Sequence, residues 1–121
     1  WAQGQYVDLY PKSVEDLQVI LNTLEDSIPV VEATEGSPIV VMLHGEEAHR
    51  FVRGNYQANK AIVDQTAKLA VIDVKICETW MRINNYERAD LFPFVGTVPY
   101  GVTELERLET EEGYTEFGVS L

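Results

Sequence analysis

The sequence predicts an α/β protein, a three-layer sandwich with a central, mostly parallel sheet. Segments typical of strands alternate with segments typical of helices along the chain, which favours right-handed βαβ units with helices on both faces of one sheet. Two strand-like segments, residues 39–44 and 71–77, are nearly continuous apolar runs, as expected for strands covered on both faces. A chain of 121 residues builds one hydrophobic core, so we treat residues 1–121 as a single domain.

The N-terminal part predicts a strand followed by a helix. Residues 5–10 alternate polar and apolar side chains of aromatic and β-branched types, which predicts a short, half-buried strand. Ser13 then resembles an N-cap, and apolar residues recur at helical spacing from Val14 to Leu24, which predicts an amphipathic helix. Residues 26–38 are rich in Ser, Pro, Glu, Thr and Gly, the composition of a solvated connection.

The middle of the chain predicts two buried strands separated by helices. The apolar run 39–44 lies between Pro38 and Gly45 and is typical of a strand in a parallel sheet. Acidic residues at 46–47 suit the start of a helix that reaches about residue 53. After a break near residues 54–55, an apolar stripe predicts a longer helix over 58–69, which leads into the strand 71–77.

The C-terminal part predicts two more helices and two more strands. Residues 78–85 indicate a helix that stops at two consecutive asparagines, and a strand is expected around 96–98. Thr103 and Glu106 have capping-box spacing, which predicts the start of the closing helix. We expect Val102, Leu105 and Leu108 to form its buried side. Residues 114–117 alternate and predict a final edge strand.

Charge and composition exclude several classes of function. Twenty acidic and nine basic residues give a net charge of −11, which repels the nucleic-acid backbone and anionic membranes, so neither is expected as a partner. No apolar run is long enough to span a bilayer. The chain has no Gly-rich phosphate fingerprint and no CxxC pair, and we expect no cofactor. It begins at Trp1 rather than Met, which suggests an exported, periplasmic product, with a cytoplasmic location as the alternative.

Two residues that end predicted strands are the candidate catalytic groups. Ligands of parallel sheets bind beyond the carboxyl ends of the strands, and His44 and Cys77 stand at such ends. Cys77, the only cysteine, is either a nucleophile activated by the following helix and by His44, or a buried structural thiol. His44 either orients a substrate and accepts the thiol proton, or simply bonds a nearby carbonyl.

Neighbouring residues complete the predicted site. We expect Gly45, Thr79, Arg82 and Tyr100 to contact a substrate, with Arg82 attracting an anionic sulfur species. Glu78 adds a negative charge next to the thiol, and His49 is expected at the surface. A metal site is not expected, because His44 and His49 are five residues apart and do not share a helical face. Aromatic residues near the site are interpreted as core and subunit interface: Trp80, Tyr86, Phe92, Phe94 and Tyr100.

The ordered combination of these motifs resembles the DsrE/DsrF-like sulfur-relay family. The resemblance covers roughly residues 38–117 and rests on a strand closing on His44-Gly45, a strand closing on Cys77, the stretches 94–95 and 98–102, apolar residues 105–108 and the turn 112–114. It implies a small DsrE-like α/β domain of flavodoxin-like topology that assembles as a homotrimer or homohexamer. It also implies that Cys77 carries a persulfide and exchanges sulfur with a donor or acceptor protein, with His44 at a position that such sequences often share.

The sequence therefore leads to two hypotheses. The first is a sulfur carrier or persulfide sulfurtransferase in which Cys77 is the nucleophile and His44 orients or tunes it. The second is a non-catalytic, oligomeric binding protein in which Cys77 and His44 line a pocket for a small ligand or a metal.

Overall fold

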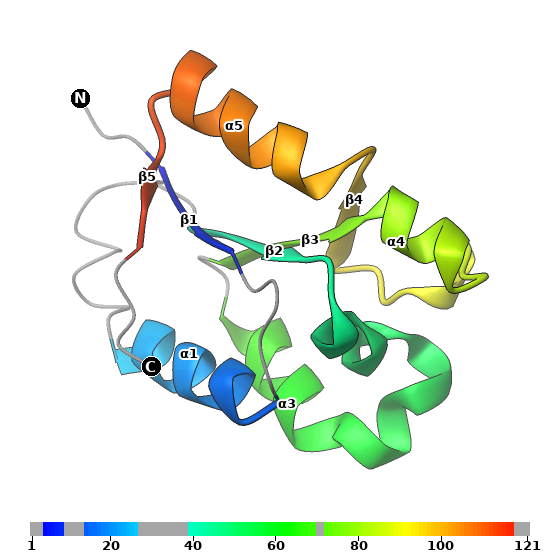
Figure 1. Cartoon of the computed structure of the whole chain (residues 1–121). Coiled ribbons are helices and arrows are strands. Elements are labelled where there is room, and N and C mark those ends of the chain that lie inside the picture. Colours follow the sequence, from blue (N-terminus) through cyan, green and yellow to red (C-terminus); the bar gives the residue numbers. More distant parts are fainter. Residues whose placement is uncertain (1–3, 9–13, 27–38, 70–71, 118–121) are drawn as a thin grey trace.

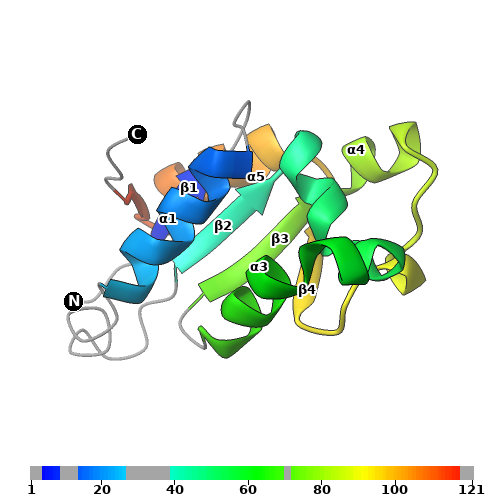
Figure 2. The same ribbon diagram turned by 90° about the horizontal axis from the view of Figure 1, so that it is seen from below.

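The protein is built on one parallel sheet. The computed structural model describes residues 4–8, 14–26, 39–69 and 72–117 (Figures 1 and 2). All strand pairs are parallel, and the strand order is β4-β3-β2-β1-β5. The strands are β1 (Gln5–Asp8), β2 (Ile39–Leu43), β3 (Ile72–Cys77), β4 (Val95–Val98) and β5 (Thr115–Glu116). The predicted α/β class with a parallel central sheet is confirmed, as is the edge position of the last strand.

The strand order differs from the flavodoxin order that the family resemblance implies. In flavodoxin-like sheets the order is 2-1-3-4-5, so the chain reverses its direction across the sheet after the second strand. Here β1 to β4 are added in one direction, and the chain then returns to place β5 beside β1. The expectation of flavodoxin-like order is therefore wrong, because local strand patterns do not encode which neighbour a strand pairs with.

Helices cover both faces of the sheet, as expected for a three-layer sandwich. In Figure 1, α1 (Val14–Asp26) and α3 (Tyr56–Lys68) lie below the sheet and α5 (Gly101–Glu111) lies above it. The view from below in Figure 2 places α1 and α3 side by side across the sheet. The short helix α4 (Glu78–Ile83) continues from β3 beyond the sheet. No helix in the described part of the chain is long and apolar enough to cross a membrane.

The alternation of β2 divides the hydrophobic core into two clusters. Ile39, Val41 and Leu43 belong to the larger cluster, which contains the buried residues of α1 and α3. Val40 and Met42 point the other way, into a smaller cluster with Leu105 and Leu108 of α5. Successive strand residues point to opposite faces, so the uninterrupted apolar run of β2 is explained by burial on both sides.

The segment after β2 forms 3₁₀ helices rather than the single helix expected over 46–53. It consists of η1 (Glu46–Phe51) and η2 (Arg53–Asn55). Ala48 and Phe51 are both buried, and residues three apart lie on one side of a 3₁₀ helix. Helix α3 follows directly and begins at Tyr56, two residues before the predicted start.

The ends of α4 and α5 confirm one sequence prediction and correct another. Helix α4 stops at the predicted asparagines, where Asn85 takes a positive φ of 60° and the Tyr86 N–H bonds the Met81 carbonyl at 2.8 Å, a Schellman-type end. Helix α5 begins at Gly101 and not at Thr103, and no side chain caps it. The early start carries Val102 to the surface, where it is 49% exposed rather than buried.

A side-chain contact fastens α5 to the sheet. The hydroxyl of Tyr6 on β1 donates a hydrogen bond to the carboxylate of Glu109 on α5. This bond and burial raise the pKa of Tyr6 to about 12, because both favour the protonated phenol. The contact therefore holds the single described helix of this face against β1.

Replacing Tyr6 by Phe is expected to remove a pH-dependent part of the stability. Folded Tyr6 ionises near pH 12 and an unfolded tyrosine near pH 10. Between these two pH values only the folded chain keeps the phenol proton, so wild-type stability falls as the pH rises through this range. Below pH 10, Tyr6→Phe should be less stable by about 1 kcal/mol, and the difference should vanish towards pH 12. Urea unfolding at a series of pH values checks this. A constant difference, or the same loss in Tyr100→Phe, would contradict it.

Candidate functional site

The carboxyl ends of the strands bring the two candidate catalytic residues together. Strands β2 and β3 are neighbours, and Leu43 is level with Ile76 in the sheet. The residues that follow in each strand direction, His44 and Cys77, therefore stand side by side at the same edge.

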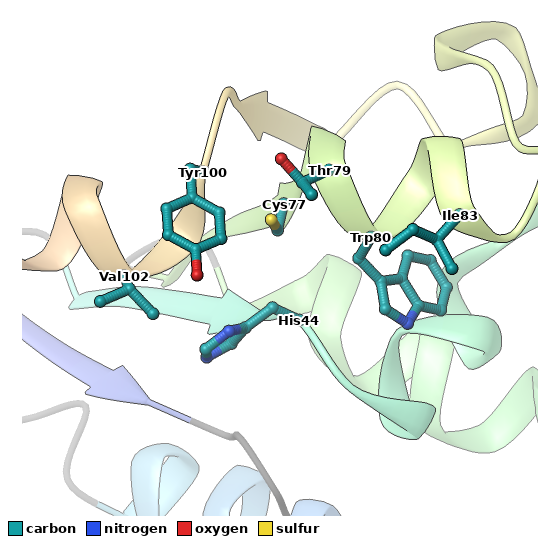
Figure 3. A pocket seen from close by; sticks show the side chains of 7 residues that line it. All are labelled: His44, Cys77, Thr79, Trp80, Ile83, Tyr100 and Val102. Carbon is teal, nitrogen blue, oxygen red and sulfur yellow. The ribbon is translucent and has the colours of Figure 1, made fainter.

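His44 and Cys77 line one cavity of about 300 Å³. Figure 3 shows their side chains facing the same space, with residues of α4 on one side and the start of α5 on the other. The lining residues are His44, Cys77, Thr79, Trp80, Ile83, Tyr100 and Val102. Of the predicted substrate contacts, Thr79 and Tyr100 belong to this cavity, whereas Gly45 and Arg82 are not among its lining residues.

Cys77 is set deep in the cavity. Its residue surface is only 2% exposed, and the sulfur points towards the ring of Tyr100 in Figure 3. Cys77 is the residue immediately before α4, but that helix has only six residues. Among the residues that line the cavity, His44 is the one whose side chain carries a basic nitrogen.

His44 is oriented by a carboxylate that sequence reasoning missed. Its Nε2 lies 2.6 Å from Oδ1 of Asp8, and the His44 side chain is only 9% exposed. A carboxylate in this position fixes the orientation of the ring. Asp8 is the last residue of β1, level with Met42 of β2. The feature of the sequence that could have indicated this role is that Asp8 is a polar residue at the end of a strand that lies next to β2.

A second buried carboxyl, Glu47, supports the turn that carries His44. Its Oε1 accepts a hydrogen bond from the Gly45 N–H at 3.1 Å, and its Oε2 is buried without a hydrogen-bond partner. Burial raises the pKa of Glu47, while backbone N–H groups and nearby His44 oppose the rise. Gly45, expected to touch substrate, is instead buried in this turn. The sequence gave no sign of this buried role for Glu47, because acidic residues are common at the starts of helices.

Polar contacts tie α4 to β4 and to the start of α5. The Thr79 hydroxyl donates to the Pro99 carbonyl at 3.0 Å and accepts from Arg82 Nη2 at 3.2 Å. The exposed Arg82 therefore touches a lining residue from outside the cavity. Thr97 of β4 donates a hydrogen bond to the Glu78 carboxylate at 2.7 Å. Glu78, the acidic residue next to Cys77, is therefore held by β4, and it is not among the residues that line the cavity.

Aromatic side chains form the wall on the α4 side. Trp80 lines the cavity and stacks on Tyr86, with ring centres 5.6 Å apart. His49 packs edge-on against Trp80, with ring centres 4.8 Å apart, and its Nδ1 lies 2.9 Å from the Tyr86 hydroxyl. His49 was expected at the surface; its side chain is 32% exposed, and the remainder of the ring packs against Trp80 and Tyr86. Phe92 and Phe94 pack on the larger core cluster, as expected.

The mouth of the cavity is apolar and exposed. Ile83 is 74% exposed, and Tyr100 and Val102 are each 49% exposed. Val102 also borders a second cavity, of about 220 Å³, between α5 and β1. Its other lining residues include four carboxylates, those of Asp8, Glu106, Glu109 and Glu116. The mouth is therefore apolar, with acidic residues on its α5 side.

No metal site is formed by the part of the chain that the structure describes. Within residues 4–8, 14–26, 39–69 and 72–117, no three His, Cys, Asp or Glu side chains are grouped to hold a metal ion.

Replacing Gly101 by Ala is expected to disturb His44 more than it disturbs the fold. A Cβ at this position would lie 3.3 Å from Met42 Cγ and 3.4 Å from His44 Cγ. The gain in helix propensity and the cost of crowding are each about 1 kcal/mol, so stability should change little. The displacement of His44, in contrast, should slow the alkylation of Cys77 several-fold. Gly54→Ala, where a Cβ meets nothing within 4 Å, is the matched control. Equal alkylation rates in the two variants would refute the prediction.

Replacing Glu47 by Gln is expected to make stability less dependent on pH. Because burial raises the pKa of Glu47 above 4.5, the folded chain keeps a proton that the unfolded chain releases, and wild-type stability falls as the pH rises through this range. Glu47→Gln retains an acceptor for the Gly45 N–H and removes the titration, so it should gain stability over wild type towards neutral pH. Glu47→Ala loses the bond as well. Urea unfolding between pH 4 and pH 8 measures this, and parallel curves for wild type and Glu47→Gln would contradict it.

Comparison with known proteins supports the fold. No family model matches the chain, and no curated protein matches it. Among solved structures, the chain is similar to a protein of unknown function, MTH1491, from Methanobacterium thermoautotrophicum. The two share 17% sequence identity, the similarity covers 93% of each chain, and the TM-score is 0.59. At this identity the similarity establishes a common fold.

Proposed function

We propose that the protein carries sulfane sulfur as a persulfide on Cys77 and acts as a sulfur carrier or sulfurtransferase. One observation carries the proposal: the only cysteine of the chain opens into a cavity of about 300 Å³ that it shares with a carboxylate-oriented histidine. A nucleophile, a base and a third group that orients the base are the parts that thiol chemistry needs. The resemblance of the sequence to DsrE/DsrF-like proteins supports the same function.

Each residue has a defined role in this proposal. His44 takes the proton of the Cys77 thiol, and the Asp8 carboxylate stabilises the imidazolium that results. The thiolate attacks the outer sulfur of a persulfide donor, the S–S bond of the donor breaks with its electron pair leaving on the inner sulfur as a thiolate, and Cys77 becomes a persulfide. A persulfide at a residue only 2% exposed is shielded from bulk water by Trp80 and Tyr100. An acceptor thiolate later removes the outer sulfur and returns Cys77 to its starting form.

Assembly into a homotrimer or homohexamer is part of the proposal. The exposed apolar side chains at the mouth, Ile83, Tyr100 and Val102, are suited to contact with another protein surface. That surface belongs to another subunit or to a sulfur donor or acceptor protein. A molecular mass measured in solution separates an oligomer from a chain that meets its partners as a monomer.

Binding without chemistry is the second candidate function. The deep position of the thiol and the apolar walls favour it, because small-molecule sites are mostly apolar pockets with a few polar groups. In that case Cys77 and His44 would contact a ligand, and the thiol would show ordinary reactivity.

Loading of Cys77 with sulfur is the direct test. After brief incubation with benzyl persulfide, mass spectrometry should show wild-type protein heavier by the mass of one sulfur atom at Cys77, and Cys77→Ser unchanged. His44→Asn removes the base and should load about a hundredfold more slowly at neutral pH. This difference should shrink at alkaline pH, where a thiol ionises without help. An unmodified Cys77 with the alkylation rate of a free thiol would favour the binding function instead.

A further inference from the structure

The interior of the cavity offers no matching charge to an anion. None of its seven lining residues is a lysine, arginine, aspartate or glutamate. Trp80, Ile83, Tyr100 and Val102 supply most of the wall, and the polar groups are the His44 ring and the hydroxyls of Thr79 and Tyr100. An anion that entered would lose its hydration, which is costly, and would meet no lysine or arginine among the lining side chains.

Charges around the cavity also disfavour the entry of an anion. The His44 ring already faces the carboxylate of Asp8. The guanidinium of Arg82 is exposed and touches the cavity only through the Thr79 hydroxyl, so its attraction for an anion is weakened by water and salt. On the opposite side of the mouth, the second cavity presents the carboxylates of Glu106 and Glu109. The whole chain adds a net charge of −11.

We infer that the sulfur species exchanged at Cys77 is a small organic persulfide with an apolar, uncharged substituent, which reacts in its protonated form R–S–SH, rather than thiosulfate or a carboxylate-bearing persulfide. The inference rests on the proposed function and names the substrate class of the same site. A cavity of about 300 Å³ lies at the lower end of the range for small-molecule pockets. The rings of Trp80 and Tyr100 give an apolar group and polarisable sulfur atoms favourable contacts.

The transfer balances without an oxidant or a reductant. The thiolate of Cys77 attacks the outer sulfur of the donor R–S–SH, so a new bond forms between Sγ and that sulfur. The S–S bond of the donor breaks, its electron pair leaves with RS⁻, and His44 returns the proton it took from Cys77 to give RSH. The sum is Cys77–SH plus R–S–SH giving Cys77–S–SH plus R–SH. The acceptor step is the same exchange in reverse, with another thiol as nucleophile.

A matched pair of donors tests the inference. Benzyl persulfide and its 4-carboxylate differ by one charge at a distance from the reacting sulfur. Loading of Cys77 by each is followed by mass spectrometry, and each rate is divided by the rate with a small free thiol. We expect the donor without the carboxylate to load about tenfold faster, equivalent to about 1.4 kcal/mol, and thiosulfate to load more slowly still. Equal normalised rates, or faster loading by either anion, would overturn the inference.

A second pair of reagents keeps this result separate from the proposed function. Iodoacetamide and iodoacetate alkylate the same thiolate and differ in charge, so their normalised rate ratio reports selectivity even where no persulfide forms. If no donor loads Cys77 but iodoacetamide is strongly preferred, the sulfur-transfer function is wrong and the preference of the cavity for neutral ligands stands. If the donors load but neither pair discriminates, the function stands and the inference is wrong.

Variants at the mouth test the physical cause. Val102 borders both the main cavity and the acidic one, so Val102→Lys places a cation between them. It should raise the rate with iodoacetate and with the carboxylated donor several-fold relative to Val102→Gln, which changes polarity without adding charge. Raising the salt concentration should reduce that gain, because it screens the charges. A carboxylate rate that is the same in both variants would show that charge at the mouth does not set the preference.

Discussion

The parallel pairing of β1, β2 and β3 is the constraint on which the site depends. With the strands in parallel, their carboxyl ends fall on one edge of the sheet, and three side chains from distant parts of the sequence meet there. Asp8 orients His44 at 2.6 Å, and His44 shares a cavity with Cys77. A shift of β2 by one residue would turn His44 to the opposite face. The buried residues on both faces of β2 oppose that shift, so the packing that stabilises the sheet also maintains the site.

The return of the chain to β5 has its own effect on the site. Because the direction across the sheet reverses after β4, α5 crosses the face opposite α1 and α3. Its first residue, Gly101, then lies against Met42 and His44, while the preceding Tyr100 forms a wall of the cavity. The far end of α5 is held to β1 through Tyr6 and Glu109. The helix thus links its own attachment to β1 with the shape of the cavity at its other end.

The sequence predicted the sheet elements and the central pair of the site well. Apolar runs predicted β2 and β3, and the residues ending them, His44 and Cys77, proved to be neighbours. Strand order could not be predicted in the same way, because it depends on pairing between distant segments. The start of α5 was misplaced because Thr103 and Glu106 satisfy a local capping rule that the packing of Gly101 overrides. Asp8 and Glu47 were missed since their roles arise only from tertiary contacts.

The solitary thiol has a consequence for how long a cargo would stay in place. The chain contains one cysteine, so a persulfide on Cys77 has no second thiol within the same chain to resolve it into a disulfide. Its release depends on a nucleophile arriving from outside and passing the apolar mouth. In the proposed function, the residence time of the sulfur would therefore be set by how fast an acceptor enters through that opening, and not by a reaction within the chain. Such a protein would hold its cargo in a solution of charged thiols and release it to an acceptor that fits the mouth.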